Sequence, residues 1–541
     1  KGLAESLRQE AILTTRKRLT MWWPWKSITT QPPKKRVGII GGGAAGMSAA
    51  WSLSRFPDRF EVAVIDASRV TGGVACTFEH EQTPGNWVPV NYGVQGGAPN
   101  SHQNTIELMK ACGFSVGSAS LEVSFGKGVF NWKNYVAAPL QEKLRSETRS
   151  FGKVLRWIAR LEFLTIFISI DFVLRLCRFS SDFRERMVYP LVALFFGTGN
   201  QTPKVSAALI ARVFLDESLR IFDYDPDYLL NQTPTNVAFD NLQSFYGKMQ
   251  QSMAENFCRF YMGRRVTQVQ RKDGKVMVQT EAAPAVWRGG SDQLEGKYPI
   301  SGGGARCQPA HANAEDEEAA RSALDHESAK ELEFDEVMFA CPADIARTLL
   351  GTGASYLEGS ILSSVEYFHD LTITHTDRDY MEKHYDVDDR AIYFIKTYDE
   401  CPSCLEMAFD LTAYQPALKS LDESGPKICQ TIFLDRERSN LWTVGELTPS
   451  KVLDRAWWSA FSHTYKHFRR VVPWVWLIQG HRHTWYCGSW TLFNTHDIAI
   501  CSGFAAAERL GAPYPFAHNA LATATYDTVL NASHLKWRSR K

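Results

Sequence analysis

Three glycines with a characteristic spacing are the residues most suited to binding a cofactor. Gly41, Gly43 and Gly46 follow a short apolar segment and precede a run of small residues. In a G-x-G-x-x-G loop the first glycine permits a tight turn, the second lets the backbone approach a pyrophosphate, and the third brings helix and strand together. The helix that starts at Ala44 and Ala45 offers free N–H groups to the phosphates. The loop therefore predicts a dinucleotide site.

The elements that must position this loop are also visible. Residues 36–40 form a predicted buried strand, 44–54 a helix, and 60–66 a second strand that is apolar throughout, as in parallel sheets. Asp66 ends that strand, where a carboxylate can accept hydrogen bonds from a ribose diol. An acid at this point disfavours the 2'-phosphate of NADP. The predicted fold class is therefore α/β, with a Rossmann-type βαβ opening.

Downstream residues extend the pattern into a family resemblance. Gly72 and Gly73 follow Asp66, and Val90-Asn-Tyr-Gly93 comes next. This arrangement resembles the flavin-containing amine oxidase superfamily, which includes phytoene desaturases and polyunsaturated fatty-acid isomerases. Residues 263–271 and 334–343 are similar to two later strands of this superfamily, and residues 372–377 together with 486–503 resemble one branch of predicted NAD/FAD-binding oxidoreductases. The resemblance implies a Rossmann-type FAD-binding domain with an interleaved substrate domain of mixed sheet and helices.

The resemblance also implies roles for individual residues. Val266 lies in a segment similar to the strand whose valine backbone holds the adenine. The positions expected to contact the ribityl chain, the pyrophosphate and the flavin are Gly488, Ser489, Asp497 and Ile498. Relatives with covalent flavin carry a cysteine at the G-S-W position, whereas here Cys487 precedes Gly488. Non-covalent FAD is therefore expected.

The sequence departs from the family at several points. Asn91 stands where many relatives have an acid, and Asp497 replaces a glutamate of the branch. Because a flavin itself takes the hydride, no separate acid–base pair is required. Indeed, neither a Ser-His-Asp set nor a group with metal-ligand spacing is recognisable, and no metal is predicted. Trp490, His375 and His496 remain as candidate catalytic residues, with core packing or structural hydrogen bonding as the alternative for each.

The predicted organisation interleaves the two domains along the chain. A basic, Trp-containing extension precedes the first segment of the FAD domain, and residues 365–445 are predicted to be rich in strands, with helices following to Val472. The predicted segments are 1–35 (extension), 36–135 (first FAD-domain segment), 136–260 (helical cap), 261–350 (second FAD-domain segment, with a flexible insertion at 282–331), 351–475 (substrate domain) and 476–541 (third FAD-domain segment and tail).

The composition of the chain indicates which kinds of partner and cellular compartment to expect. With 60 Lys and Arg against 59 Asp and Glu, no global charge indicates nucleic acid. The 11 cysteines have no repeating spacing, which favours a reducing compartment. No apolar run is long enough to span a membrane, but Leu161–Leu176 is predicted to be a buried or membrane-lying helix. The acid-poor segment from Ala11 to Pro57 resembles an organelle-targeting region or an interfacial anchor, so the expected location is intracellular, mitochondrial or plastid, and membrane-associated.

Three functions stay open at this stage. The first is an FAD-dependent oxidoreductase or isomerase acting on a hydrophobic, lipid-like or isoprenoid-like substrate. The second is an amine oxidase that produces hydrogen peroxide. The third is a flavoprotein fold retained as an accessory subunit of a membrane complex, favoured by the basic N-terminus and the substituted motif positions.

Overall fold

A computed structural model describes residues 33–196, 199–230, 232–283, 330–419 and 425–536. The N-terminal extension predicted at 1–35 and the insertion predicted at 282–331 lie almost entirely outside these residues. Among the described residues, strand β15 (Glu331–Phe334) begins at the last residue of the predicted insertion. None of the helices in the described ranges is both long and apolar enough to cross a membrane.

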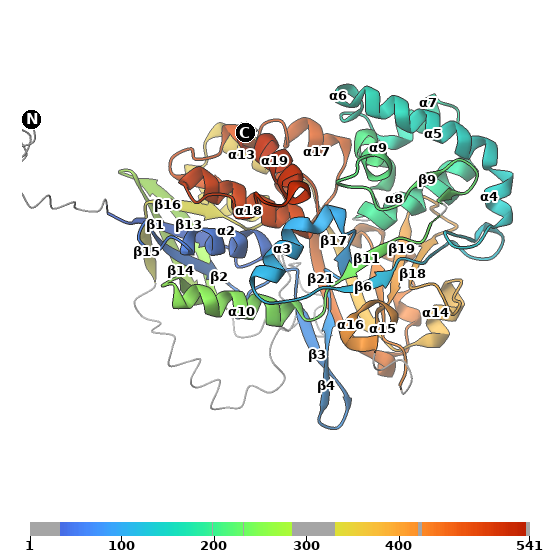
Figure 1. Cartoon of the computed structure of the whole chain (residues 1–541), viewed down its shortest axis with the longest axis horizontal. Helices are drawn as coiled ribbons and strands as arrows, with labels where there is room; N and C mark the ends of the chain where they lie inside the picture. Colours follow the sequence, from blue (N-terminus) through green and yellow to red (C-terminus); the bar gives the residue numbers. More distant parts are fainter. Residues whose placement is uncertain (1–32, 197–198, 231, 284–329, 420–424, 537–541) are drawn as a thin grey trace, which may run out of the picture. The chain divides into compact units, whose positions relative to one another are not determined.

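A five-stranded parallel sheet forms the first layer (Figure 1). Its strand order is β12-β2-β1-β16-β22, and its members are β12 Arg259–Met262, β2 Phe60–Asp66, β1 Lys35–Ile40, β16 Glu336–Phe339 and β22 Thr484–Tyr486. All four pairings are parallel. Val37, Val64 and Val337 are fully buried, as expected for strands covered on both faces. The predicted Rossmann-type opening is confirmed.

One helix packs on this sheet, and a second helix packs on the first. Helix α2 (Ala44–Ser54) follows the glycine loop, and α18 (His496–Leu510) lies against it. A Cβ on Gly503 would lie 2.1 Å from the carbonyl oxygen of Ala45, and the Ser48 hydroxyl donates to the carbonyl of Ile500 at 3.0 Å. Small residues therefore let α2 and α18 pack closely, although Ser48 and Ile500 are 452 positions apart in the sequence.

The remaining elements of this region include the hairpin predicted at residues 265–280. It consists of β13 (Arg264–Lys272) and β14 (Lys275–Ala282), joined at Asp273 and Gly274, and β15 pairs with β14. Other helices here are α3 Gln103–Ala111, α10 Leu242–Glu255, α12 Ala343–Leu350, α13 Tyr356–Leu362, α17 Tyr465–Arg470 and α19 Ala520–His534.

A seven-stranded mixed sheet forms the second layer. Its order is β21-β17-β20-β19-β18-β7-β8, and its members are β21 Val452–Phe461, β17 Tyr367–His375, β20 Cys429–Phe433, β19 Leu405–Asp410, β18 Tyr393–Thr397, β7 Val123–Phe125 and β8 Trp132–Lys133. The substrate region is therefore interleaved with the FAD-domain segments, because β7 and β8 come from the segment predicted at 36–135. The prediction of helices between residues 445 and 472 was wrong for β21.

Helices cover one end of the second sheet (Figure 1). They are α4 Pro139–Lys143, α5 Arg145–Arg160, α6 Glu162–Thr165, α7 Ile170–Leu176, α8 Tyr189–Phe196 and α9 Ala207–Leu215. Residues 161–176 do not form the single helix that was predicted. The chain breaks between α6 and α7 because the Ser169 hydroxyl accepts from the N–H of Phe172 and starts a new helix.

Smaller sheets complete the architecture. Strand β3 (Thr77–Thr83) pairs with β4 (Asn86–Asn91), and the short strands β5 (Gly96–Gly97), β11 (Thr235–Ala238) and β6 (Gly117–Ser120) form a three-stranded sheet. Strand β12 and helix α10 lie in the region predicted as a helical cap, yet β12 extends the Rossmann sheet. The boundary at residue 260 therefore falls inside a strand of the first layer.

Candidate functional site

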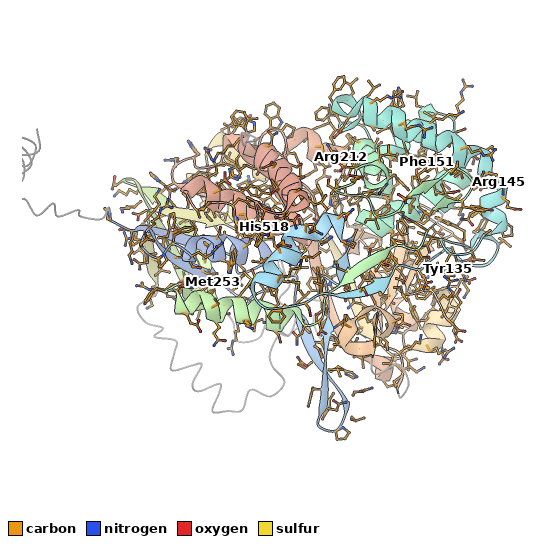
Figure 2. All side chains as sticks on the ribbon, in the orientation of Figure 1. Tyr135, Arg145, Phe151, Arg212, Met253 and His518 are labelled. Atoms are coloured by element: carbon orange, nitrogen blue, oxygen red, sulfur yellow. The ribbon has the colours of Figure 1, made fainter. Side chains whose placement is uncertain are left out.

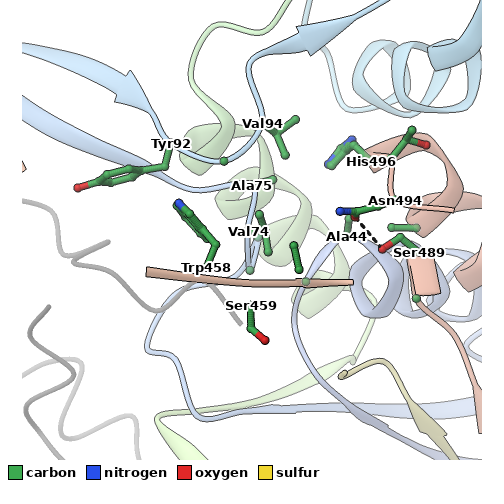
Figure 3. A pocket seen from close by; sticks show the side chains of 18 of the residues that line it. Ala44, Val74, Ala75, Tyr92, Val94, Trp458, Ser459, Ser489, Asn494 and His496 are labelled. Carbon is green, nitrogen blue, oxygen red and sulfur yellow. Dashed lines mark hydrogen bonds between the residues drawn. The ribbon is translucent and has the colours of Figure 1, made fainter. Parts of the chain in front are cut away.

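One large cavity connects the two layers. It has a volume of about 1800 Å³ and extends from the glycine loop after β1 to the seven-stranded sheet. A single drug-sized ligand occupies roughly 300–1,000 Å³, so this space can hold a dinucleotide and a second molecule together. Figure 3 shows Val74 and Ala75 from one loop and Trp458 from β21 around it, with Asn494 just before α18 and His496 at the start of that helix.

The glycine loop has the geometry that its spacing predicts. Gly41 has a φ of +114°, and a Cβ there would lie 2.5 Å from the carbonyl oxygen of Ala340. A Cβ on Gly46 would lie 1.9 Å from the carbonyl oxygen of Gly41. Gly43 differs, because its Cβ would meet nothing closer than 3.8 Å and the residue lines the cavity. Gly41 and Gly46 therefore permit the turn, whereas Gly43 leaves space for a ligand.

Asp66 holds the loop from the end of β2. One carboxylate oxygen accepts from the N–H of Gly42 at 2.6 Å and the other from the N–H of Ser68 at 2.7 Å. Burial raises the pKa of Asp66, against the lowering effect of these two hydrogen bonds. The carboxylate lines the cavity and retains lone pairs for a ribose diol.

The segment containing Val266 lies beside Asp66. The N–H of Gly263 donates to the carbonyl of Ser68 at 2.8 Å, and Val266 lines the cavity. The structure thus brings the predicted adenine contact next to the predicted ribose contact, although the two are 200 residues apart in the sequence.

The second glycine pair forms another wall. Gly72 and Gly73 have φ values of +117° and +61°, and the N–H of Gly72 donates to the carbonyl of Gly42 at 2.8 Å. Both glycines line the cavity. The backbone of this loop therefore runs alongside the first glycine loop without side chains between them.

A second helix N-terminus closes the site. Gly488, Ser489 and Ile498 line the cavity, as do Ala44 and Ala45 at the start of α2. The Thr495 hydroxyl caps α18 by accepting from the N–H of Ile498 at 3.2 Å. Two positive helix ends therefore face one cavity, which favours anionic groups there.

The Asp497 side chain does not face this cavity, which corrects its predicted flavin contact. It is fully buried and accepts hydrogen bonds from the N–H of Thr105 at 2.7 Å, the Thr105 hydroxyl at 2.9 Å and the Asn104 amide at 3.1 Å. Asp497 therefore joins α18 to α3, and only its backbone belongs to the helix end near the site.

The two candidate histidines have different positions. His375 lies outside the cavity lining, where Nδ1 accepts from the N–H of Asp377 at 3.2 Å and Nε2 contacts the Thr431 hydroxyl at 3.0 Å. Its predicted contact with flavin or substrate was wrong, because β17 turns the ring into the sheet interior. His496 lines the cavity, with Nε2 2.6 Å from the Tyr246 hydroxyl. Burial lowers the pKa of His496 to about 3, so this ring is neutral.

Trp490 is the candidate with an unused polar atom. It lines the cavity and is 3% exposed, and its indole N–H has no hydrogen-bond partner among the described residues. Buried donors are usually paired, so this N–H is suited to a bound group. Cys487, by contrast, is fully buried and absent from the lining, as expected for a flavin that is not attached there.

The far end of the cavity, hereafter the substrate chamber, is mainly apolar. Helices α8 and α9 and strands β18, β19, β20 and β21 contribute to it. Its apolar lining residues include Leu194, Phe195, Phe196, Leu209, Val213, Met407, Phe409, Ile432 and Trp458. Its amide and carboxyl side chains are Gln95, Asn236, Asp370, Gln430 and Asp454.

Cations line only the other end of the cavity. Arg69 follows Asp66, and Arg264 and Arg265 begin β13 next to it. Within the described ranges, no Lys or Arg lines the substrate chamber. The described lining of the chamber therefore offers no cationic partner to a carboxylate, whose desolvation without a partner is costly. In the portion of the chain that the structure describes, no cluster of three metal-ligating side chains exists either.

Sequence reasoning missed Trp458 and Asn494. Trp458 faces the cavity from β21, and the Ser489 hydroxyl lies 3.2 Å from the Asn494 amide oxygen (Figure 3). The alternation of buried Asp454, Ala456 and Trp458 with half-buried neighbours is the period-two signal of a strand. The sequence of this strand, VLDRAWWSAF, does not show that alternation, because Asp454 is on the same face as Trp458 and Leu453 and Trp457 are on the other.

Asp454 gives a testable pH effect. Burial raises its pKa to about 7 from the ordinary 3.8, so between these values the folded protein binds a proton that the unfolded chain releases. The stability from this group is present below pH 3.8 and is lost as the pH rises through about 7. Asp454→Asn should reduce the fall in unfolding free energy between pH 5 and 7 by about 2–3 kcal/mol relative to the parent protein. Urea unfolding at both pH values measures this, and an identical pH dependence in both proteins would contradict it.

Comparisons with known proteins agree with this geometry. Residues 39–112 match the family described as an NAD(P)-binding Rossmann-like domain. The search of curated proteins found no match.

Among solved structures, the fold is similar to a fatty acid isomerase from P. acnes that produces CLA, with a TM-score of 0.57 and 13% identity over 89% of this chain and 99% of that one. Cyclohexylamine oxidase from Brevibacterium oxydans gives a TM-score of 0.55 and 12% identity, over 88% of this chain and 100% of that chain. Putrescine oxidase gives a TM-score of 0.54 and 12% identity, over 89% and 100%. At 12–13% identity, these likenesses show that the chain shares the fold of these proteins over most of its length.

Proposed function

We propose that this chain is an FAD-dependent oxidoreductase or isomerase that binds FAD non-covalently and acts on a neutral hydrophobic substrate. The observation that carries the proposal is the single cavity, in which a phosphate-binding glycine loop opens into an apolar chamber. A nucleotide-binding domain without further function would not need the second space.

The residues present suit FAD. The glycine loop and the start of α2 would hold the pyrophosphate, Asp66 the ribose, and the Val266 segment the adenine. Gly488, Ser489 and the N-terminus of α18 would contact the flavin end, where the free indole N–H of Trp490 is available. When bound, FAD supplies a two-electron centre that accepts or returns a hydride.

The protein's own contribution would be orientation and exclusion of water. Trp458, Phe409 and Met407 surround the chamber with apolar surface. His496 is neutral and its two ring nitrogens contact the Tyr246 and Thr105 hydroxyls, so it keeps a fixed orientation beside the cofactor end. It would thereby contribute shape and a fixed dipole without adding charge.

The chamber's charge favours a neutral substrate over a free fatty acid. Its described lining offers amides and two carboxyl groups but no cation. Burial raises the pKa of Asp370 and of Asp454 to about 7. An isoprenoid-like hydrocarbon needs no ionic partner, whereas a carboxylate would lie near groups of its own charge.

The visible absorption spectrum tests the cofactor. The purified full chain should show flavin bands that move into the supernatant after acid precipitation. Anaerobic addition of neutral isoprenoids and of their matching free acids then tests the substrate, and bleaching of the flavin by the neutral members alone is expected. A protein that is colourless and takes up no added FAD would exclude the enzyme and favour the accessory-subunit function.

A hydrophobic amine is the second candidate. The same two carboxyl groups in a chamber without Lys or Arg in its described lining would attract an ammonium group. The two proposals differ in the fate of oxygen, since an amine oxidase releases hydrogen peroxide. Peroxide formation with a panel of apolar amines would favour this alternative, and its absence together with anaerobic bleaching by isoprenoids would exclude it.

A further inference from the structure

Six large apolar side chains project from the helices at the outer end of the second layer. They are between 39% and 68% exposed, and five of the six lie in the apolar stretch 161–176. We call them the apolar patch, and they are Trp157 of α5, Phe163 and Leu164 of α6, Phe167 of the following turn, and Phe172 and Leu176 of α7. Clustered exposure of this kind marks an interaction surface.

The apolar patch is separate from the apolar side chains that form the core beneath these helices. Helix α5 already buries Phe151, Leu155 and Ile158, and Phe151 packs edge-on against Phe183 and Phe214. Figure 2 shows Phe151 and Arg145 on α5 and Arg212 on the neighbouring α9. These helices therefore have one apolar face that stabilises the fold and a second that is exposed.

Basic residues accompany the patch. Residues 145–178 contain seven Arg and Lys but three acids, whereas the whole chain has a net charge of +1. Each acid is engaged, since Glu147 accepts from Ser180, Glu162 pairs with Arg212 and Asp171 pairs with Arg184.

Several of these cations are free. Lys153, Arg156 and Arg160 are exposed on α5 and have no ion-pair partner among the described residues. Their spacing of three and four residues places them along one face of the helix. The free positive charge is therefore on the same helix as Trp157 of the patch.

We propose that the apolar patch docks the protein on an anionic lipid bilayer, with Lys153, Arg156 and Arg160 contacting lipid phosphates. Aromatic and aliphatic side chains beside free cations are the combination that binds a helix in the plane of an interface. Lys and Arg near an anionic surface each contribute about 1 kcal/mol of attraction. A second copy of this chain is a poorer occupant, because the two copies would present the same positive charges to each other.

The patch lies across α9 from the substrate chamber. Helix α9 lines the chamber with Leu209 and Val213, and α5, α6 and α7 pack on α9. A docked bilayer would therefore be separated from the chamber by one helix layer. This proposal does not depend on the proposed reaction, since it rests on the surface alone.

The test measures how three full-length variants bind to vesicles of phosphatidylcholine. The vesicles contain roughly 30% phosphatidylglycerol, which gives them an anionic surface. The triple variant Phe163→Ser/Phe167→Ser/Phe172→Ser should bind at least about tenfold more weakly than the parent, because three apolar side chains no longer enter the interface. The variant Lys153→Glu/Arg156→Glu should lose binding to anionic vesicles and change little on pure phosphatidylcholine. The control Phe257→Ser/Tyr356→Ser removes side chains that are 79% and 88% exposed elsewhere and should bind as the parent does.

Hydrogen–deuterium exchange shows which residues of the chain contact the vesicles. Vesicles should slow exchange in peptides spanning residues 153–178 of the parent, independently of any other lipid contact in the chain. Flavin absorbance and far-UV circular dichroism check that each variant is folded. Unchanged exchange in these peptides, or equal vesicle binding by the triple variant, would overturn the proposal. So would a dimer in light scattering that the triple variant converts to monomer, which would assign the patch to a second copy.

Discussion

Gly43→Glu is expected to yield a folded protein that has lost its flavin. A side chain at this position meets no atom closer than 3.8 Å and enters the cavity between the two glycine loops. The added carboxylate would occupy the place of the pyrophosphate and oppose its charge, which costs several kcal/mol. FAD affinity should therefore fall at least roughly a hundredfold. Absorbance after gel filtration and titration of the apoprotein with FAD measure the loss.

Two matched variants at the same loop separate binding from folding. Gly43→Ala should retain FAD within a few-fold, because its methyl group fits the open space. Gly46→Ala should lower the unfolding temperature instead, since its methyl group would collide with the carbonyl oxygen of Gly41 at 1.9 Å. Flavin binding by Gly43→Glu equal to that of the parent would contradict the assignment of this loop to the pyrophosphate.

The second large effect is expected at Asp497, on stability. Asp497→Ala removes the acceptor for the Thr105 N–H and for the Thr105 hydroxyl and Asn104 amide, all of them buried. Leaving such donors unpaired should lower the unfolding free energy by about 2–4 kcal/mol. Denaturant unfolding measures it, and the flavin spectrum of the folded fraction should match that of the parent.

The variant Asp497→Asn serves as the control. Its amide oxygen can still accept from Thr105, so it should lose less stability than the alanine variant. An Asp497→Ala protein of unchanged stability with an altered flavin spectrum would show instead that the carboxylate itself acts on the cofactor.

The cofactor half of the site could be predicted because its signals are local. The glycine loop, Asp66 and the strand on either side of α2 are set by spacing over about thirty residues, where backbone sterics and helix ends act directly. Gly41 and Gly46 have the close backbone contacts that this reasoning requires. Val266 was found by resemblance, and only the pairing of Gly263 with Ser68 explains why it belongs there.

The substrate half could not be predicted from local signals. Trp458 and Asn494 come from separate segments of the sequence. They line the same cavity because the fold brings β21 next to the residues that precede α18. His375 and Asp497 have side chains that suit a functional site. In the folded chain, however, both side chains make hydrogen bonds to partners outside the cavity. The apolar stretch at 161–176 was likewise predicted to be one helix. In a sequence with so many apolar residues, Ser169 alone does not indicate that a new helix begins after it.

By itself, then, the sequence determined the fold class, the glycine loop and the place of Asp66 beside that loop, since these depend on backbone geometry over short distances. The tertiary structure decided which side chains face the cavity, where its charge lies and which apolar residues remain exposed. These depend on contacts between segments hundreds of residues apart, and a residue's type does not reveal which neighbour will bury it.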